Sequence, residues 1–120
     1  MSKVKGNRGE SLAASYLEGL GYKILERNFK GPRGEVDIIV MKENTVVFTE
    51  VKTYSFSGLE ALERAVNLRK RSRILDVARF FLMKFPLYAD KIIRFDVILV
   101  TDDVQSPIHL ENAFTEFGVS

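Results

Sequence analysis

The chain contains no cysteine and only one histidine, His109, in 120 residues. Without thiols it can form neither a disulfide nor a thiolate metal site, and a single imidazole does not support a zinc site. The absence of disulfides is consistent with a cytoplasmic protein. Any catalysis is therefore expected to use carboxylates, lysines and a hard metal ion.

Long hydrophobic runs are also missing. The first ten residues are polar, and no stretch approaches the roughly 18 apolar residues that a membrane helix needs. We therefore expect no membrane association and a cytoplasmic location.

The chain has little excess charge of either sign, because its net charge is only +2. Attraction to nucleic acid would have to come from local clusters of basic residues.

What is present is the composition of one globular domain, with 46% hydrophobic and 28% charged residues. A chain of this length can bury a core without disulfides or a structural metal. We find no repeat, no low-complexity tract and no linker. We therefore expect a single domain over residues 1–120, with residues 1–6 as a loose tail.

Two helices are expected from the spacing of apolar residues. The first begins near Asn7, with Glu10 three residues later as in a capping box, and ends at Gly21. The second helical region begins at a capping-box signature formed by Ser57 and Glu60. A break near Asn67 could split it into two helices, and its apolar stripe over 74–85 is ended by Pro86, which cannot continue a helix.

Five strands are expected from β-branched and alternating residues between turn signals. They cover residues 22–29, 35–41, 46–53, 94–101 and 108–114. The fourth is apolar on both faces and is expected to be a buried strand. The resulting order, α-β-β-β-α-β-β, predicts an α/β fold in which helices flank a mixed sheet.

The second and third strands predict a cluster of charged residues. If Glu43-Asn44 is a two-residue loop, the hairpin register puts Asp37 directly opposite Glu50 and Glu35 opposite Lys52. Side chains alternate along a strand, so these four are expected to share one face. Three carboxylates and one lysine would then gather at one end of the hairpin.

Facing carboxylates at Asp37 and Glu50 would repel each other unless a cation lies between them. A divalent ion such as Mg²⁺ or Mn²⁺ suits oxygen ligands and could polarise a phosphodiester. Lys52 could stabilise the charge that develops on the phosphate or orient the attacking water. The alternative is simpler: Glu35 and Lys52 form a cross-strand ion pair on a solvated face.

A basic run precedes the second helix's apolar stripe. It consists of Arg64, Arg69, Lys70, Arg71 and Arg73. These cations fall near the expected N-terminus of the second half of the helix, where the macrodipole disfavours positive charge. Beside the free backbone N–H groups of that end, they would form a site for an anion such as phosphate. We therefore assign Arg69, Lys70 and Arg73 to nucleic-acid binding, with a solvated helix face as the alternative.

Two further residues have structural interpretations. Asp96 lies in the apolar fourth strand and is expected to form an ion pair, with Arg94 as an awkward but reachable partner. His109 is expected to be an ordinary surface or edge-strand residue.

The segments Gly34-Glu35-Val36-Asp37 and Glu50-Val51-Lys52-Thr53 are similar to the PD-(D/E)xK nuclease signature. More closely, the chain resembles the YraN-like family, uncharacterised bacterial relatives of archaeal Holliday-junction resolvases. The resemblance extends to Gly6, Gly9-Glu10, Ala13, Gly21-Tyr22, Arg27-Asn28, Ala65-Val66, Lys70, Arg94-Phe95-Asp96-Val97 and Asn112-Ala113-Phe114. Tyr54 departs from the arginine that is common in that family, which leaves substrate choice open.

The resemblance implies a restriction-endonuclease-like fold with Asp37 and Glu50 as metal ligands and Lys52 as the motif lysine. It also implies Glu10 as an additional acid of the site, although the residues alone fit Glu10 equally well as part of a capping box.

The expected function is a metal-dependent endonuclease that uses Mg²⁺ or Mn²⁺ on DNA, including branched DNA. The alternatives are a nucleic-acid-binding module that keeps the fold without turnover, and an interaction protein that docks a partner at its sheet edge. Resolvase-like cleavage of a four-way junction needs two active sites and hence a homodimer. No heptad or apolar seam in the sequence predicts that dimer.

Overall fold

The computed structural model describes residues 2–53, 68–100 and 107–113, with side chains described from Arg8 in the first helix and from Arg73 in the second. Its elements, in chain order, are α1 (Ser2–Gly19), β1 (Lys23–Gly31), β2 (Gly34–Lys42), β3 (Thr45–Thr53), α3 (Leu68–Lys84), the 3₁₀ turn η1 (Pro86–Tyr88), β4 (Ile92–Val100) and β5 (Ile108–Leu110). The expected order α-β-β-β-α-β-β is confirmed. The architecture is compatible with a restriction-endonuclease-like fold.

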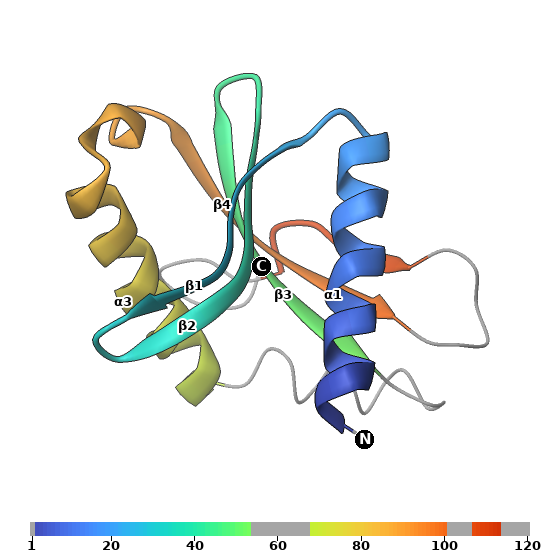
Figure 1. Ribbon diagram of the computed structural model, residues 1–120. Helices are drawn as coiled ribbons and strands as arrows, with labels where there is room; N and C mark the ends of the chain where they lie inside the picture. Colours follow the sequence, from blue (N-terminus) through green and yellow to red (C-terminus); the bar gives the residue numbers. More distant parts are fainter. Residues whose placement is uncertain (1, 54–67, 101–106, 114–120) are drawn as a thin grey trace.

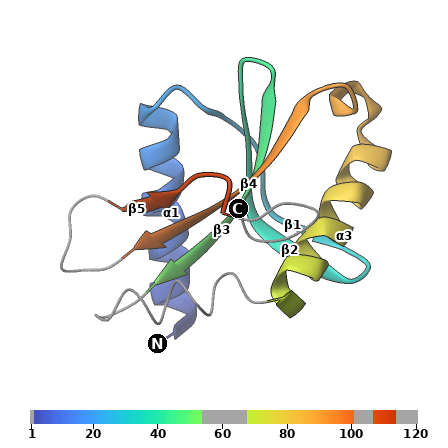
Figure 2. The same ribbon diagram turned by 180° about the vertical axis from the view of Figure 1, so that it is seen from behind.

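The five strands form one mixed sheet in the order β1-β2-β3-β4-β5. β3 and β4 run parallel, and the other neighbouring pairs are antiparallel. Parallel strands need a crossover connection, and α3 lies in the connection between β3 and β4. Helix α3 covers one face of the sheet and α1 covers the other (Figure 1), and the view from behind shows the same two layers (Figure 2).

Two apolar clusters fill the two interfaces. The cluster under α3 is built around Phe48 and Phe81, whose rings lie 5.6 Å apart in an edge-to-face arrangement. The cluster under α1 includes Leu17, Ile38 and Ile98. The middle strands therefore bury side chains on both faces, which explains their nearly continuous apolar sequence.

The start of α1 differs from the sequence expectation. The helix begins at Ser2, so residues 2–6 are helical and the expectation of a loose tail is wrong. Asn7 lies inside the helix and does not cap it, and the capping box with Glu10 is therefore also wrong. A capping-box pattern specifies a helix start only when the preceding residues leave the helix, and here they continue it.

The end of α1 is as expected. Gly21 has a φ of 97°, the left-handed conformation that glycine adopts without a steric penalty. The N–H of Gly21 bonds the carbonyl of Glu18 at 3.0 Å, and the N–H of Tyr22 bonds that of Leu17, also at 3.0 Å. These two bonds form a Schellman motif, and Leu17 and Tyr22 pack in one cluster beside it.

The remaining boundaries are close to those expected. Helix α3 ends at Lys84, and Pro86 begins the 3₁₀ turn η1. The last strand is shorter than expected, because β5 ends at Leu110 and Asn112 has a φ of 53°. No helix in the described parts of the chain is long and apolar enough to cross a membrane.

Candidate functional site

The hairpin register that underlies the predicted site is confirmed along most of its length. Lys42 pairs with Thr45 across the two-residue loop, and the regular pairing continues to Ile38 opposite Thr49. Glu43 has a φ of 55°, which lets the loop close without the preferred Asn-Gly pair. The next pair in this register would be Asp37 and Glu50, but the ladder ends before it.

The side chain of Asp37 connects β2 to β3 where the backbone ladder ends. Its Oδ2 accepts a hydrogen bond from the backbone N–H of Val51 at 2.8 Å. The carboxylate is thereby held against the backbone of β3 at Val51, which follows Glu50, only 6% exposed, and precedes the half-buried Lys52 in the sequence. The three residues of the predicted motif therefore come from neighbouring positions of β2 and β3.

The alternation of side chains is interrupted at Asp37. Val36 and Ile39 both pack in the cluster under α3, whereas Ile38 packs under α1. Regular alternation would have put Val36 on the same face as Ile38. The expectation that Glu35 shares a face with Asp37 and Ile39 is therefore wrong.

The partner strand is irregular at the same level. Arg27 pairs with Ile38 and Phe29 pairs with Val36, which leaves Asn28 across from Asp37. Asn28 has a φ of 52°. Asparagine tolerates this left-handed conformation better than most residues do. Both strands therefore change the facing of their side chains at one level of the sheet, beside the candidate site.

Glu10 reaches the same end of the sheet because α1 packs very closely there. A Cβ atom at Gly9 would lie 2.6 Å from Cγ2 of Thr53, the last residue of β3. Only glycine allows this approach. It places the next residue, Glu10, beside the strand that carries Glu50 and Lys52.

The electrostatics of Glu10 reflect this crowding. Burial and the negative charge of Asp37 raise the pKa of the Glu10 carboxyl above its ordinary value, with a further contribution from Glu35. A hydrogen bond from Asn28 and the charge of Arg27 oppose that rise in the pKa. Oε1 of Glu10 is buried and has no hydrogen-bond partner among the residues that the structure describes.

Part of the predicted nucleic-acid-binding run can be placed. The run lies in the first turns of α3, where Arg73 is exposed and packs its Cβ over Gly34. The side chains of Arg69 and Lys70 lie outside the described residues. Arg73 therefore borders the strand that carries Asp37.

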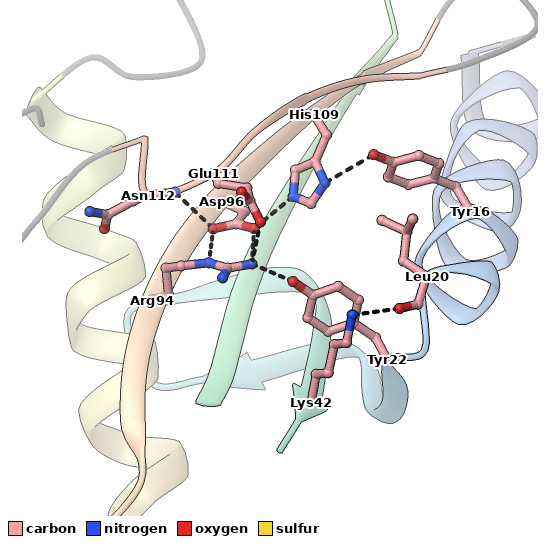
Figure 3. A network of polar contacts seen from close by, with 9 residues as sticks. All are labelled: Tyr16, Leu20, Tyr22, Lys42, Arg94, Asp96, His109, Glu111 and Asn112. Atoms are coloured by element: carbon pink, nitrogen blue, oxygen red, sulfur yellow. Dashed lines mark hydrogen bonds and ion pairs between the residues drawn. The ribbon is translucent and has the colours of Figure 1, made fainter. Parts of the chain in front are cut away.

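A second polar cluster lies on the α1 side of the sheet (Figure 3). Asp96 is 1% exposed, and both of its oxygens accept hydrogen bonds from the Arg94 guanidinium at 2.9 Å. Its Oδ2 also accepts a 2.6 Å bond from Nε2 of His109, and its Oδ1 accepts one from the N–H of Asn112. The expected Arg94–Asp96 ion pair is present.

His109 has a larger role in this cluster than the sequence suggested. Its side chain is only 7% exposed, and Nδ1 lies 3.2 Å from the hydroxyl of Tyr16 on α1. An ionised carboxylate only accepts, so Nε2 carries the proton toward Asp96, and in the neutral ring Nδ1 accepts from Tyr16. His109 thus connects β4 to α1. An acid within an apolar strand was the one sequence signal for such a cluster.

Charge is well compensated in this cluster. Burial alone would raise the pKa of Asp96, but hydrogen bonds from His109, Arg94 and the Asn112 N–H hold it below its ordinary value. The bond to Asp96 chiefly raises the pKa of Arg94. Arg94 also bonds the hydroxyl of Tyr22.

The same cluster contains a set of potential metal ligands. Ligand atoms of Asp96, His109 and Glu111 lie within 4.8 Å of one another. However, Arg94 bonds both Asp96 oxygens and lies 3.3 Å from Glu111. A metal ion would have to displace this guanidinium, so we interpret the cluster as a structural one.

Comparisons with known proteins agree with one another. Residues 9–100 match the model of "Uncharacterised protein family UPF0102". A UPF0102 protein of Persephonella marina is 37% identical over 94% of this chain and 95% of its own length, and one of Geobacter metallireducens is 43% identical over 94% and 93%. The chain therefore belongs to the UPF0102 family.

A solved structure titled "Crystal structure of SSO0001" is 18% identical, with a TM-score of 0.43 over 97% of this chain. The chain spans 54% of that structure's length.

Proposed function

We propose that this protein is a metal-dependent endonuclease that cleaves phosphodiester bonds of DNA. The observation that carries the proposal is the hydrogen bond from the Val51 N–H to the Asp37 carboxylate, which holds an acid at the strand residue that follows Glu50 and precedes Lys52. Two acids and a lysine on neighbouring strands suit phosphoryl chemistry, because the acids can hold a metal ion and the lysine can stabilise negative charge on the phosphate.

The residues fit a hard divalent ion. The donors are carboxylate oxygens, the preferred ligands of Mg²⁺ and Mn²⁺. Glu10 is consistent with such a site, because its Oε1 is buried without a described partner and burial together with the charge of Asp37 raises its pKa. Asp37 and Glu50 would hold the ion, with Glu10 as a further acid of the site. When bound, the ion would polarise the scissile phosphate and lower the pKa of a water molecule.

Lys52 has a separate task in this proposal. It is two residues from Glu50 on the same strand face, about 7 Å along the strand. From there its ammonium can contact a phosphate oxygen. Negative charge on that phosphate grows in the transition state, so a fixed cation favours the transition state over the ground state. Lys52 is therefore expected to raise turnover more than affinity.

The test is a cleavage screen over duplex, single-stranded, flap and four-way DNA with Mg²⁺ and with Mn²⁺. Lys52→Ala should bind DNA like the wild type and lose cleavage. Lys84→Ala is the control, because it removes one cation from the far end of α3. Wild-type turnover in Lys52→Ala would refute its catalytic role.

The second candidate is a nucleic-acid-binding module without turnover. The exposed Arg73 beside β2 favours it, because this residue can bind a phosphate whether or not the carboxylates hold a metal ion. Binding of DNA without cleavage of any substrate in the screen would select this function.

A further inference from the structure

The β1–β2 turn lies directly under α3 and forms a corner with it. A Cβ atom at Gly34 would lie 3.4 Å from Cβ of Arg73, and one at Gly31 would lie 3.4 Å from the ring of Phe80. Nε of Arg33, in the turn itself, lies 3.7 Å from Oδ2 of Asp76 on α3. The turn and the helix are therefore held in a close and specific arrangement. We call this surface, formed by Arg33, Arg73, Asp76 and Arg79, the hairpin corner.

The hairpin corner concentrates positive charge. Arg33, Arg73 and Arg79 are exposed, whereas Asp76 is half-buried between them. Asp76 contacts Arg33 and Arg79 only at 3.7 and 3.6 Å, and exposed pairs of this kind contribute little stability. The whole chain carries a net charge of only +2, so this excess of cations is a local feature. Stability does not explain why the cations gather here.

The corner is also close to the candidate site. Gly34 begins β2, and Asp37 follows it after three residues, or about 10 Å along the strand. One strand of duplex DNA advances about 3.4 Å per nucleotide along the helix axis, so a strand that spans this distance carries more than one phosphate. A nucleic-acid strand whose phosphate lies at Asp37 would bring a neighbouring phosphate to the corner.

We propose that Arg33 and Arg73 bind the phosphodiester backbone of the nucleic-acid substrate on the hairpin side of the candidate site. Guanidinium groups form two parallel hydrogen bonds to phosphate oxygens and remain charged at every physiological pH. The single carboxylate of Asp76 neutralises only part of the charge of the corner. The contacts are to the backbone, so they position the substrate and do not read its sequence. The inference rests on the proposed function for its substrate and adds the turn residue Arg33 as a contact.

The experiment measures binding without cleavage. Fluorescence anisotropy of labelled duplex and four-way DNA is recorded in EDTA across a salt series, for the wild type, Arg33→Ala, Arg73→Ala and the double variant. Each single variant should lower the slope of log affinity against log salt by about 0.9, and the double variant by about twice as much. Both side chains are exposed, so all variants should keep the wild-type circular dichroism spectrum and melting temperature.

The matched control is the double variant Lys23→Ala/Lys84→Ala. It removes two charges from β1 and α3, at the ends of these elements opposite to the corner. This control should retain the wild-type salt slope. An additional variant, Arg33→Lys, should keep the slope and lose part of the affinity, because lysine keeps the charge but not the paired hydrogen bonds.

Equal salt slopes in the corner and control variants would overturn the inference, and so would a wild type that binds no DNA. A corner that instead binds anionic vesicles, with unchanged DNA binding, would assign it to a membrane surface and also reject the proposal. Corner-dependent binding without cleavage in Mg²⁺ or Mn²⁺ would support the inference while the endonuclease proposal fails. Cleavage by the wild type, together with unchanged salt slopes in the corner variants, would support the endonuclease proposal and overturn the inference about the corner.

Discussion

The Asp37 carboxylate accepts the backbone N–H of Val51 at 2.8 Å, at the point where the β2–β3 ladder ends. A side chain here replaces the backbone carbonyl that would otherwise continue the pairing. The bond has a structural effect, since it closes the end of the hairpin. It also holds the carboxylate on β3 at the residue that follows Glu50, so the structural and chemical roles of Asp37 can be separated by substitution.

Asp37→Asn and Asp37→Ala should separate these roles. Asparagine keeps an oxygen acceptor for the Val51 N–H, so its stability should stay within about 0.5 kcal/mol of the wild type. Alanine leaves that N–H without its acceptor and should cost about 1.5 kcal/mol. Urea unfolding in EDTA measures both values. Calorimetry with Mn²⁺ should show that both variants lose the metal site, and retained wild-type Mn²⁺ affinity in either one would remove Asp37 from the ligand set.

Gly9→Ala should destabilise the protein although alanine favours helices. The added Cβ would lie 2.6 Å from Cγ2 of Thr53, so α1 would have to move away from β3. We expect a net loss of about 1–3 kcal/mol in the free energy of unfolding, the range for overpacked sites. Gly19→Ala is the control. Gly19 lies in the same helix, and a Cβ atom there would have no neighbour within 4 Å. This substitution should be neutral or stabilise by up to about 1 kcal/mol, and equal effects of the two substitutions would show that the Gly9 contact is not restrictive.

Glu10→Gln should stabilise the metal-free protein at neutral pH. Burial and Asp37 raise the pKa of Glu10 above the unfolded value, so the folded state binds its proton more tightly. The resulting stability is present below the unfolded pKa and is lost as the pH rises through the raised folded pKa. Glutamine removes this loss, so its advantage over the wild type in urea unfolding should grow between pH 4 and 7. Saturating Mg²⁺ should reverse the order, and an advantage that does not depend on pH would contradict the electrostatic explanation.

Asp96→Asn should be strongly destabilising and should change how the free energy of unfolding falls as the pH is lowered. Hydrogen bonds lower the pKa of Asp96 below the unfolded value, so its contribution is fully present above about pH 4 and is lost as the pH falls through the folded pKa. The substitution leaves Arg94 without its buried partner and should cost about 3 kcal/mol at neutral pH. Unfolding curves between pH 2 and 6 should be flatter for the variant. Parallel curves for the two proteins would show that Asp96 does not control this dependence on pH.

Much of the fold follows from local sequence patterns. Strand positions reflect alternating or continuous apolar residues, and the hairpin register follows from a loop of two residues between Lys42 and Thr45. The end of α1 at Gly21 and the end of α3 before Pro86 depend on backbone conformations that these two residues favour or exclude. These features depend on neighbours within a few positions along the chain, so the sequence alone can specify them.

Other features were decided only by tertiary packing. The change in the side-chain facing of β2 at Asp37 depends on Asn28 on the neighbouring strand and on the hydrogen bond from the Val51 N–H to the Asp37 carboxylate. Glu10 reaches the candidate site because Gly9 lets α1 lie against Thr53, a contact between residues 44 positions apart.

The polar cluster around Asp96 was also decided by tertiary packing and could not be predicted from local sequence patterns. His109 is 13 positions from Asp96 and 93 from Tyr16, and no local pattern joins them. The sequence by itself determined which segments become helices and strands and the register of the β2–β3 hairpin near its loop. The tertiary structure decided which of these side chains meet, because burial makes each polar group take whichever partner the packing brings within reach.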